Sequence, residues 1–145
     1  MTGRQAPLLS VRDLKVVFPT PIGMVHAVDG VSFDLEAGQS MGIVGESGSG
    51  KSVSMLAVMG LLPDTATITA DEMTFDGKNL LTMSPQERRR VIGREITMIF
   101  QDPLTALNPV YRVGDQIAEM IRAHDRQAGK VTARRRAVDL LGEVG

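Results

Sequence analysis

The sequence predicts an α/β fold in which antiparallel strands come first, a core around a glycine-rich loop follows, and helices come last. Three features indicate this order. Residues 8–39 alternate between apolar and polar positions with turn residues between them, which is typical of half-buried strands. Residues 40–101 begin with an apolar run, the glycine-rich loop and a helical segment. Residues 102–145 contain two stretches with apolar residues at helical spacing.

The composition fits one globular domain with an aliphatic core. The 145 residues are 43% hydrophobic but only 3% aromatic, and the formal net charge is −1. A charge so close to zero gives no indication of nucleic-acid binding. The absence of cysteine excludes disulfides and cysteine-ligated zinc from this stretch. The longest apolar runs, such as residues 56–62, are too short to cross a bilayer, so membrane association would require a partner protein.

The N-terminal part is expected to form an antiparallel sheet. The predicted strands of this sheet are residues 8–18 and 27–35, and residues 36–39 are predicted to be a turn. In the second strand, Val31, Phe33 and Leu35 fall on one side, which predicts one buried face. Prolines and a glycine within residues 19–23 predict a loop between the first two strands. Further along the chain, within residues 40–101, residues 73–75 are predicted to be a strand, and Asp76 and Gly77 a tight turn after it.

The core is predicted to start with residues 40–44, a short apolar run of the kind that forms a strand buried on both faces. This run leads directly into the glycine-rich loop. Residues 51–62 contain no helix breaker except Gly60, and Pro63 follows, so we expect a helix that ends there. Strand, glycine-rich loop and helix, in this order, are the context that a phosphate-binding loop requires.

Three further helices and one strand are predicted downstream. Ser84 and Glu87 form a capping box, which predicts a helix that stops near Gly93. Residues 95–101 are predicted to be a strand that ends in Gln101. A helix from Val113 is expected to place on one face Ile117, Met120, Ile121 and His124. A last helix, residues 133–144, is expected to turn inward Ala137, Leu140, Leu141 and Val144.

The phosphate loop is the segment GESGSGKS, which matches the pattern G-x-x-x-x-G-K-[ST]. Its members are Gly45, Glu46, Ser47, Gly48, Ser49, Gly50, Lys51 and Ser52. Small residues let the backbone N–H groups point inward and form an anion-binding nest, to which the positive end of the next helix adds. Lys51 is expected to reach the β- and γ-phosphates, Ser52 to bind Mg²⁺, and the Glu46 side chain to face solvent. Kinases, GTPases, helicases and transport ATPases all share this loop, so it does not name a reaction.

Two longer segments indicate a family. VHAVDGVSFDLEAGQSMGIVGESGSGKSVSMLAVMGLL and MIFQDPLTALNPVYRVGDQIAEMI resemble the ATP-binding subunits of dipeptide and oligopeptide ABC importers. The loop core Glu-Ser-Gly-Ser-Gly and Gln-Asp-Pro followed by Leu-Asn-Pro are typical of that branch, although Ala106 and Asp71 depart from its usual residues. The resemblance implies the P-loop NTPase fold of ABC ATPases. It implies a β subdomain at 8–39, a phosphate-loop core at 40–101, and the Q-loop and start of a helical subdomain at 102–145.

The resemblance also implies site residues and cofactors. Gln101 would begin the Q-loop and reach both Mg²⁺ and the attacking water, which makes Gln101 and Lys51 the candidate catalytic residues. An ordinary surface amide is the alternative interpretation of Gln101. Phe18 matches the aromatic residue that stacks on adenine in this family, and a strand-end core residue is its alternative. The implied cofactors are ATP and Mg²⁺.

The same family needs a signature motif, a Walker B strand and a switch histidine, and none occurs in these 145 residues. Asp102 does not replace the Walker B carboxylate, because Gln101 separates it from the apolar run. His26 and His124 are expected to be structural. We therefore expect a chain that binds ATP but hydrolyses it poorly, either as a fragment or as a naturally short protein. The alternatives are a nucleotide-binding module without turnover, a small-molecule kinase and a DNA-repair ATPase.

The resemblance implies partners and a location. Membrane-spanning permease subunits would dock near residues 101–120, where the apolar positions are Pro103, Leu104, Leu107 and Pro109. A second ATP-binding subunit would complete a homo- or heterodimer, and an extracytoplasmic substrate-binding protein would act indirectly. The expected location is peripheral, on the cytoplasmic face of the cell membrane. Nickel or another small solute is the alternative cargo. No nucleic-acid partner is expected, and the arginine runs 88–90 and 134–136 are interpreted as solvated faces.

Overall fold

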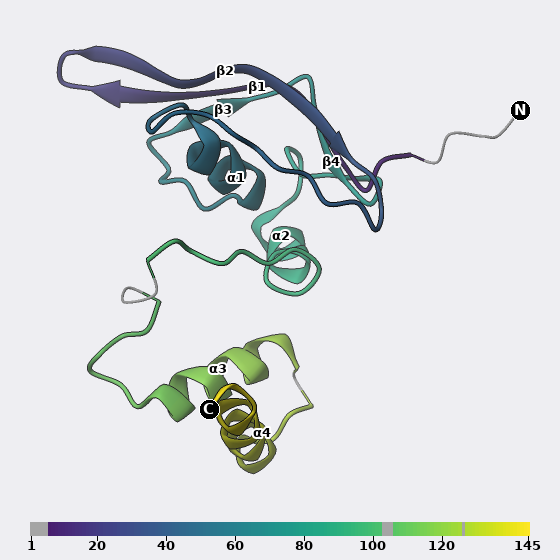
Figure 1. Ribbon diagram of the computed structural model, residues 1–145, viewed down its shortest axis with the longest axis vertical. Coiled ribbons are helices and arrows are strands. Elements are labelled where there is room, and N and C mark those ends of the chain that lie inside the picture. Colours follow the sequence, from purple (N-terminus) through teal and green to yellow (C-terminus); the bar gives the residue numbers. More distant parts are fainter. Residues whose placement is uncertain (1–5, 103–105, 126) are drawn as a thin grey trace, which may run out of the picture. The chain divides into compact units, whose positions relative to one another are not determined.

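A computed structural model describes residues 6–102, 106–125 and 127–145. The chain forms two compact units, Met1–Arg88 and Arg89–Gly145. The first unit contains the strands and the helix α1, and the second contains the helices α3 and α4 (Figure 1). None of the helices in these described ranges combines the length and the apolar character that spanning a bilayer requires.

An antiparallel sheet forms the first unit. Its strands are β1 (Leu9–Thr20), β2 (Gly23–Leu35), β3 (Thr67–Thr69), β4 (Glu72–Phe75) and β5 (Lys78–Asn79). Among the described residues the order is β2-β1-β4-β5, and β3 also pairs with β1. β1 and β2 make a long hairpin (Figure 1). The prediction of an antiparallel N-terminal sheet is therefore confirmed.

The loop predicted within residues 19–23 is instead a tight turn. The register runs to the pair Thr20 and Gly23, so only Pro21 and Ile22 lie between the strands. The Thr20 hydroxyl donates to the Gly23 carbonyl oxygen over 2.7 Å. Pro19 is tolerated inside β1, since β3 pairs only with residues 15–17 and leaves β1 with one neighbour here.

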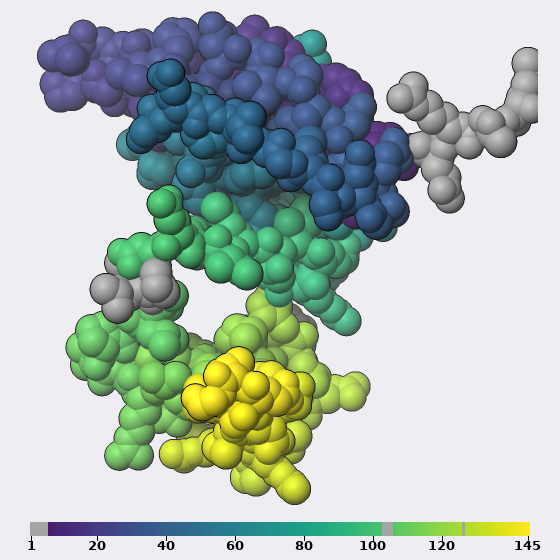
Figure 2. Space-filling view, viewed as in Figure 1, coloured from purple at the N-terminus to yellow at the C-terminus, as the bar shows by residue number. Residues whose placement is uncertain are grey.

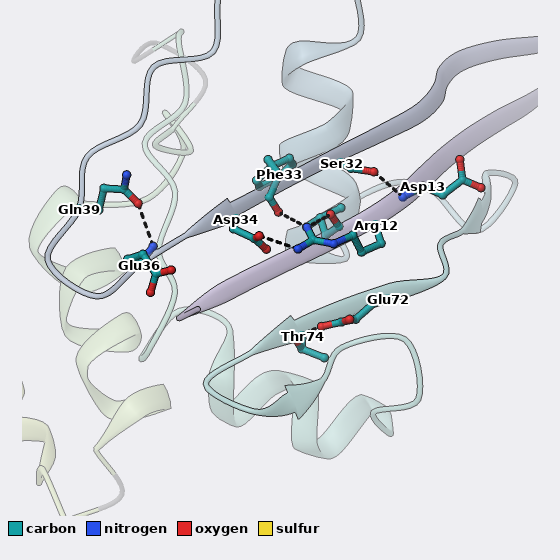
Figure 3. A network of polar contacts seen from close by, with 10 residues as sticks. Arg12, Asp13, Ser32, Phe33, Asp34, Glu36, Gln39, Glu72 and Thr74 are labelled. Carbon is teal, nitrogen blue, oxygen red and sulfur yellow. Dashed lines mark hydrogen bonds and ion pairs between the residues drawn. The ribbon is translucent and has the colours of Figure 1, made fainter. Parts of the chain in front are cut away.

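A bulge in β1 is held by polar contacts with β2 (Figure 3). Asp13 has a φ of 48°, and its N–H donates to the Ser32 hydroxyl over 2.9 Å. The Arg12 guanidinium lies 2.5 Å from the Asp34 carboxylate and donates to the Phe33 carbonyl oxygen over 3.3 Å. The hydrogen bond to Asp34 raises the pKa of Arg12. These contacts replace the ladder bonds that the bulge interrupts.

The hydrophobic core lies between the sheet and α1 (Lys51–Met59). It is built from Val11, Leu14, Val16, Val28, Ala57, Val58, Met73 and Leu80. All are aliphatic or methionine, as the composition predicts, and Phe18 and Phe33 pack against them while half-buried. Removing a Val, Leu or Met side chain fully from water stabilises the folded state by roughly 1.5–3 kcal/mol. The core therefore fixes α1 on the sheet.

Local turn and cap signals are confirmed. Asp76 and Gly77 have φ values of 47° and 71°, which make the tight turn between β4 and β5. The helix α2 (Pro85–Val91) begins after Ser84. The Glu87 carboxylate accepts from the Ser84 N–H over 2.9 Å, and the Glu87 N–H donates to the Ser84 hydroxyl over 3.3 Å. This reciprocal pair is the predicted capping box.

Two predicted strands are wrong. Residues 40–44 have no regular secondary structure and are exposed, and Figure 2 shows the blue segment at residues 40–50 on the surface of the first unit. In the described part of the chain, the only β pairing of residues 95–101 is the isolated bridge between Ile92 and Ile96, and Ile99 is 97% exposed. A strand needs a neighbouring strand to pair with, and burial on both faces needs other elements packed on both sides of the sheet. In the described ranges no strand pairs with residues 40–44 or 97–101.

The second unit packs α3 (Val113–His124) against α4 (Lys130–Val144). α4 begins three residues before its predicted start, and Ala133 and Ala137 are fully buried. Ile117, Ile121 and Leu140 are half-buried, as expected for an inward face. The prediction is wrong for Met120, His124, Leu141 and Val144, which are exposed. Because alanine is small, the two helices approach each other most closely at Ala133 and Ala137. The residues toward the ends of the predicted apolar faces are left exposed.

Candidate functional site: the phosphate loop

The phosphate loop, residues 45–52, connects the extended segment 40–44 to α1. Its backbone turns where the Ser49 N–H donates to the Glu46 carbonyl oxygen over 3.2 Å. Gly48 and Gly50 have φ values of 83° and 85°, in the left-handed region that glycine occupies without strain. When residues of left-handed backbone conformation lie next to residues of right-handed conformation, successive N–H groups point to one side and form an anion-binding nest.

Close contacts leave little room for a side chain at Gly50 and at Gly45, the two glycines of the motif. A Cβ atom on Gly50 would lie 2.5 Å from the Ala27 carbonyl oxygen and 3.3 Å from Cγ2 of Val28. The start of α1 is thereby pressed against β2. A Cβ atom on Gly45 would lie 2.7 Å from the Ser49 hydroxyl oxygen, which is on the loop itself. The sequence pattern predicts both glycines, but it does not predict the contact of Gly50 with β2.

The Lys51 side chain folds back over the loop. Its ammonium group donates to the carbonyl oxygens of Gly45 over 2.6 Å and of Glu46 over 2.7 Å. It also lies 3.2 Å from the Ser49 hydroxyl oxygen. These three acceptors carry no formal charge, so they orient the cation without neutralising it. The positive charge of Lys51 is therefore held at the loop, where a phosphate group would gain a charge-assisted hydrogen bond.

The N-terminus of α1 adds to this positive region. Gly50 is its N-cap and makes no side-chain cap hydrogen bond, and the first turn contains no acidic residue. Its first N–H groups therefore face no capping carboxylate, and the helix dipole favours an anion there. The Ser54 hydroxyl and N–H both bond to the Gly50 carbonyl oxygen, at 2.9 and 2.8 Å, and stabilise the junction.

A magnesium site at this loop would depend on Ser52. The Ser52 side chain lies in the first turn of α1 and is exposed, as are Glu46 and Ser47. Within the described ranges, no group of three or more His, Asp or Glu side chains could hold a metal ion. A hard cation at the loop would therefore take the hydroxyl oxygen together with phosphate and water oxygens, which is the ligand set that Mg²⁺ prefers.

Phe18 lies on the strand pair that supports the loop. It is half-buried, packs against the core and pairs with Val25 of β2. Ala27 and Val28, a few positions further along β2, are the residues that touch Gly50. The core contact is thus observed for Phe18, and its stacking on adenine stays a prediction.

Gln101 belongs to the second unit. It is exposed and follows residues 97–100, which have no regular secondary structure. Pro103 and Leu104 of the predicted docking segment lie outside the described residues, whereas Leu107 and Pro109 are exposed. His26 is exposed and pairs with Val17 in the hairpin, and it directly precedes Ala27, which touches Gly50. The structural role expected for His26 and His124 stays a prediction.

The structure corrects the interpretation of Arg88. The sequence suggested a solvated arginine run at residues 88–90, and Arg89 and Arg90 are indeed exposed. Arg88 is half-buried instead, and its guanidinium group donates to the Leu80 carbonyl oxygen and rests on Gly60. No periodicity or motif predicts this contact, because Gly60 and Arg88 belong to different helical segments.

Comparison with known proteins identifies the family of the chain. The sequence profile described as "ABC transporter" matches residues 28–144, which is most of the chain. The dipeptide transport ATP-binding protein DppD of Escherichia coli (strain K12) is 49% identical over 138 residues, which cover 95% of this chain and 42% of that protein.

Two oligopeptide transport ATP-binding proteins are similar to the same extent. OppD of Bacillus subtilis (strain 168) is 47% identical over 143 residues, covering 98% of this chain and 40% of the relative. OppD of Mycobacterium tuberculosis (strain ATCC 25618 / H37Rv) is 49% identical over 140 residues, covering 97% of this chain and 23% of the relative. The chain thus spans less than half the length of these curated relatives.

Proposed function

The chain belongs to the ABC transporter family, and on this basis we propose that it is the ATP-gripping part of the ATP-binding subunit of a di- or oligopeptide importer. The observation that carries the proposal is the phosphate loop, whose glycines, lysine and helix N-terminus together form a site for a polyphosphate. The names of the similar proteins support the choice of cargo. An importer for nickel or another small solute is the alternative within the same family.

Each residue of the loop has a distinct task in this proposal. The backbone N–H groups of Ser47, Gly48, Gly50 and Lys51 bind phosphate oxygens. The Lys51 ammonium group exchanges part of its hydrogen bonding to the loop carbonyl oxygens for contacts with the β- and γ-phosphates. Ser52 holds Mg²⁺, which when bound neutralises charge on the phosphates. Phe18 stacks on the adenine ring from the strand pair that supports the loop. Gln101 orients the attacking water and contacts the metal ion.

ATP turnover needs groups beyond the phosphate loop. In-line phosphoryl transfer needs an oriented water and stabilisation of charge on the transferred group. The signature, Walker B and switch-histidine residues that the family uses for this purpose do not occur in these 145 residues. The chain alone therefore serves nucleotide binding, and hydrolysis by it is slow.

The proposed partners follow from the same assignment. Permease subunits dock near residues 101–120 and carry the cargo, a second ATP-binding subunit completes the dimer, and a substrate-binding protein selects the peptide outside the cell. The protein then lies peripherally on the cytoplasmic face of the membrane. Leu104, which the sequence suggested as a docking residue, lies outside the described residues, so Leu107 is the exposed position at which to test docking.

Uptake assays test this proposal. The gene that encodes the chain is deleted, and uptake of labelled dipeptide, oligopeptide and nickel is compared before and after complementation. Complementation uses the whole gene as it stands in the genome, because these 145 residues alone are proposed to hydrolyse ATP slowly. We expect the wild-type gene and the matched control Lys130→Ala, at an exposed lysine that begins α4, to restore peptide uptake. Lys51→Ala should fail to do so. Intact peptide uptake in the deletion strain would reject the peptide assignment, and loss of nickel uptake alone would favour the alternative.

A further inference from the structure

The helix that begins at the phosphate loop is held at its other end by an arginine. The guanidinium group of Arg88, in α2, donates to the carbonyl oxygen of Leu80, which is 1% exposed. The same side chain lies against Gly60. A Cβ atom on Gly60 would lie 2.8 Å from Cζ and 2.9 Å from Cδ of Arg88, so this contact tolerates no side chain at residue 60.

Gly60 is the C-cap of α1. Its φ of 64° is left-handed, its N–H donates to the Ala57 carbonyl oxygen over 3.0 Å, and the Leu61 N–H donates to the Leu56 carbonyl oxygen over 2.9 Å. The last turn of α1 contains no basic residue. A cation near the C-terminus of a helix is favourable, because it complements the partial negative charge of the last carbonyl groups. Arg88 provides this cation from another helix.

An arginine suits this position better than a lysine. The guanidinium group is planar and can lie flat on a glycine while its N–H groups donate in a fixed direction. An ammonium group is compact and strongly hydrated, so it could not make both contacts equally well. Arg89 and Arg90, the neighbours of Arg88 in the arginine run, are exposed.

We propose that Arg88 is a positioning residue for the phosphate loop: by fixing Gly60 at the end of α1, it fixes the loop at the beginning of α1. The helix of nine residues is short, so a displacement of its C-terminal end is transmitted along it to Gly50 and Lys51. This inference rests on the proposed nucleotide binding for its functional consequence. The contact of Arg88 with Gly60 does not depend on nucleotide binding.

The first test compares nucleotide affinity in variants of the full chain. A fluorescent ATP analogue with Mg²⁺ is titrated into wild type, Arg88→Met, Arg88→Lys and the matched control Arg89→Met. We expect Arg88→Met to bind about three- to tenfold more weakly, in the range of helix-terminus effects, and Arg88→Lys to recover part of the loss. Arg89→Met should bind like wild type. Equal affinities of wild type and Arg88→Met would overturn the proposal.

The second test does not require nucleotide. Hydrogen exchange is followed at the amides of Ser49 and Ser54, which are hydrogen-bonded within the loop and to Gly50. We expect exchange at both amides to be at least about threefold faster in Arg88→Met than in Arg89→Met, because local opening becomes easier. Faster exchange confined to the end of α1, with unchanged Ser49 and Ser54, would overturn positioning of the loop.

A double-mutant cycle tests the contact itself. Gly60→Ala should lower the melting temperature by about 5 °C or more in wild type, since it combines a left-handed alanine with a collision. In the Arg88→Ala background the collision is absent, so the decrease should be clearly smaller. The same decrease in both backgrounds would overturn the contact. The two proposals can fail separately. If the wild-type chain binds no nucleotide, but the exchange test and the double-mutant cycle give the expected results, the proposed function is rejected and the positioning role of Arg88 is supported.

Discussion

Gly50 lies directly against the backbone of Ala27, so close that a Cβ atom on the glycine would be 2.5 Å from the alanine carbonyl oxygen. This contact joins the phosphate loop to the β1–β2 hairpin. The loop therefore has a rigid support on one side, and α1, packed on the core, on the other. The geometry that would grip a polyphosphate depends on both.

Replacing Gly50 should damage stability and nucleotide binding together. In Gly50→Ala, the left-handed φ of 85° and the collision with Ala27 should lower the free energy of unfolding by about 2–4 kcal/mol. Chemical denaturation measures this change. The control is Gly114→Ala, in α3, where a Cβ atom meets nothing within 4 Å and the free energy should stay equal or rise slightly. Equal stability of the two variants would contradict the account of Gly50.

The capping box at α2 should contribute measurable stability. Ser84→Ala removes the hydroxyl group that accepts from the Glu87 N–H and donates to the Glu87 carboxylate over 2.7 Å. We expect a loss of about 1 kcal/mol in the free energy of unfolding, the usual value for an N-cap serine. Gln86→Ala, an exposed change in the same helix, serves as the control. If the two variants unfold at the same denaturant concentration, the box does not stabilise the helix.

The ion pair at the β1 bulge predicts a pH dependence. The hydrogen bond to Asp13, at 2.8 Å, raises the pKa of Lys15. A raised lysine pKa stabilises the folded state below the pKa of the unfolded lysine, about 10.4, and this contribution is lost as the pH rises through the folded value. Asp13→Asn tolerates the positive φ but removes the carboxylate. The stability difference between wild type and this variant should stay constant from pH 7 to about 9.5 and shrink above it.

The measurement is a series of urea denaturations of both proteins at increasing pH. The effect should be small, because both side chains are about two-fifths exposed and therefore screened by water. A difference that grows as lysine loses its proton would have the wrong sign for this ion pair.

The chain alone should hydrolyse ATP no faster than its Lys51→Ala variant. Gln101 could orient a water molecule, but the carboxylate and signature residues that the family uses for phosphoryl transfer do not occur in these 145 residues. Phosphate release by purified, monomeric protein measures this rate. Turnover clearly above that of the variant would show that other residues of the chain complete the reaction.

Local signals in the sequence predicted their structures well. The capping box at Ser84, the turn at Asp76 and the glycine conformations of the phosphate loop each depend on a few neighbouring residues, so their chemistry can be read without the fold. The family resemblance, carried by two long segments, is confirmed by the profile match and by the similar proteins.

Features that depend on residues far apart in the sequence could not be predicted from local patterns. Residues 40–44 have the composition of a buried strand, but composition does not provide the neighbouring strands that such a strand needs. The contact of Arg88 with Gly60 is set by how two helices meet, and a run of arginines on a short helix gives no sign of it. The roles of Phe18 and Gln101 stay predictions, since they concern a nucleotide and a metal ion.

The central claim is that the loop around Lys51 binds nucleotide, and one titration tests it most directly. A fluorescent ATP analogue with Mg²⁺ is titrated into wild type, Lys51→Ala and the exposed-lysine control Lys130→Ala. Loss of the charge-assisted hydrogen bonds of Lys51 should weaken binding by about 2 kcal/mol or more, roughly 30-fold, while Lys130→Ala binds like wild type. Equal affinities of wild type and Lys51→Ala would contradict the assignment of this loop as the phosphate site.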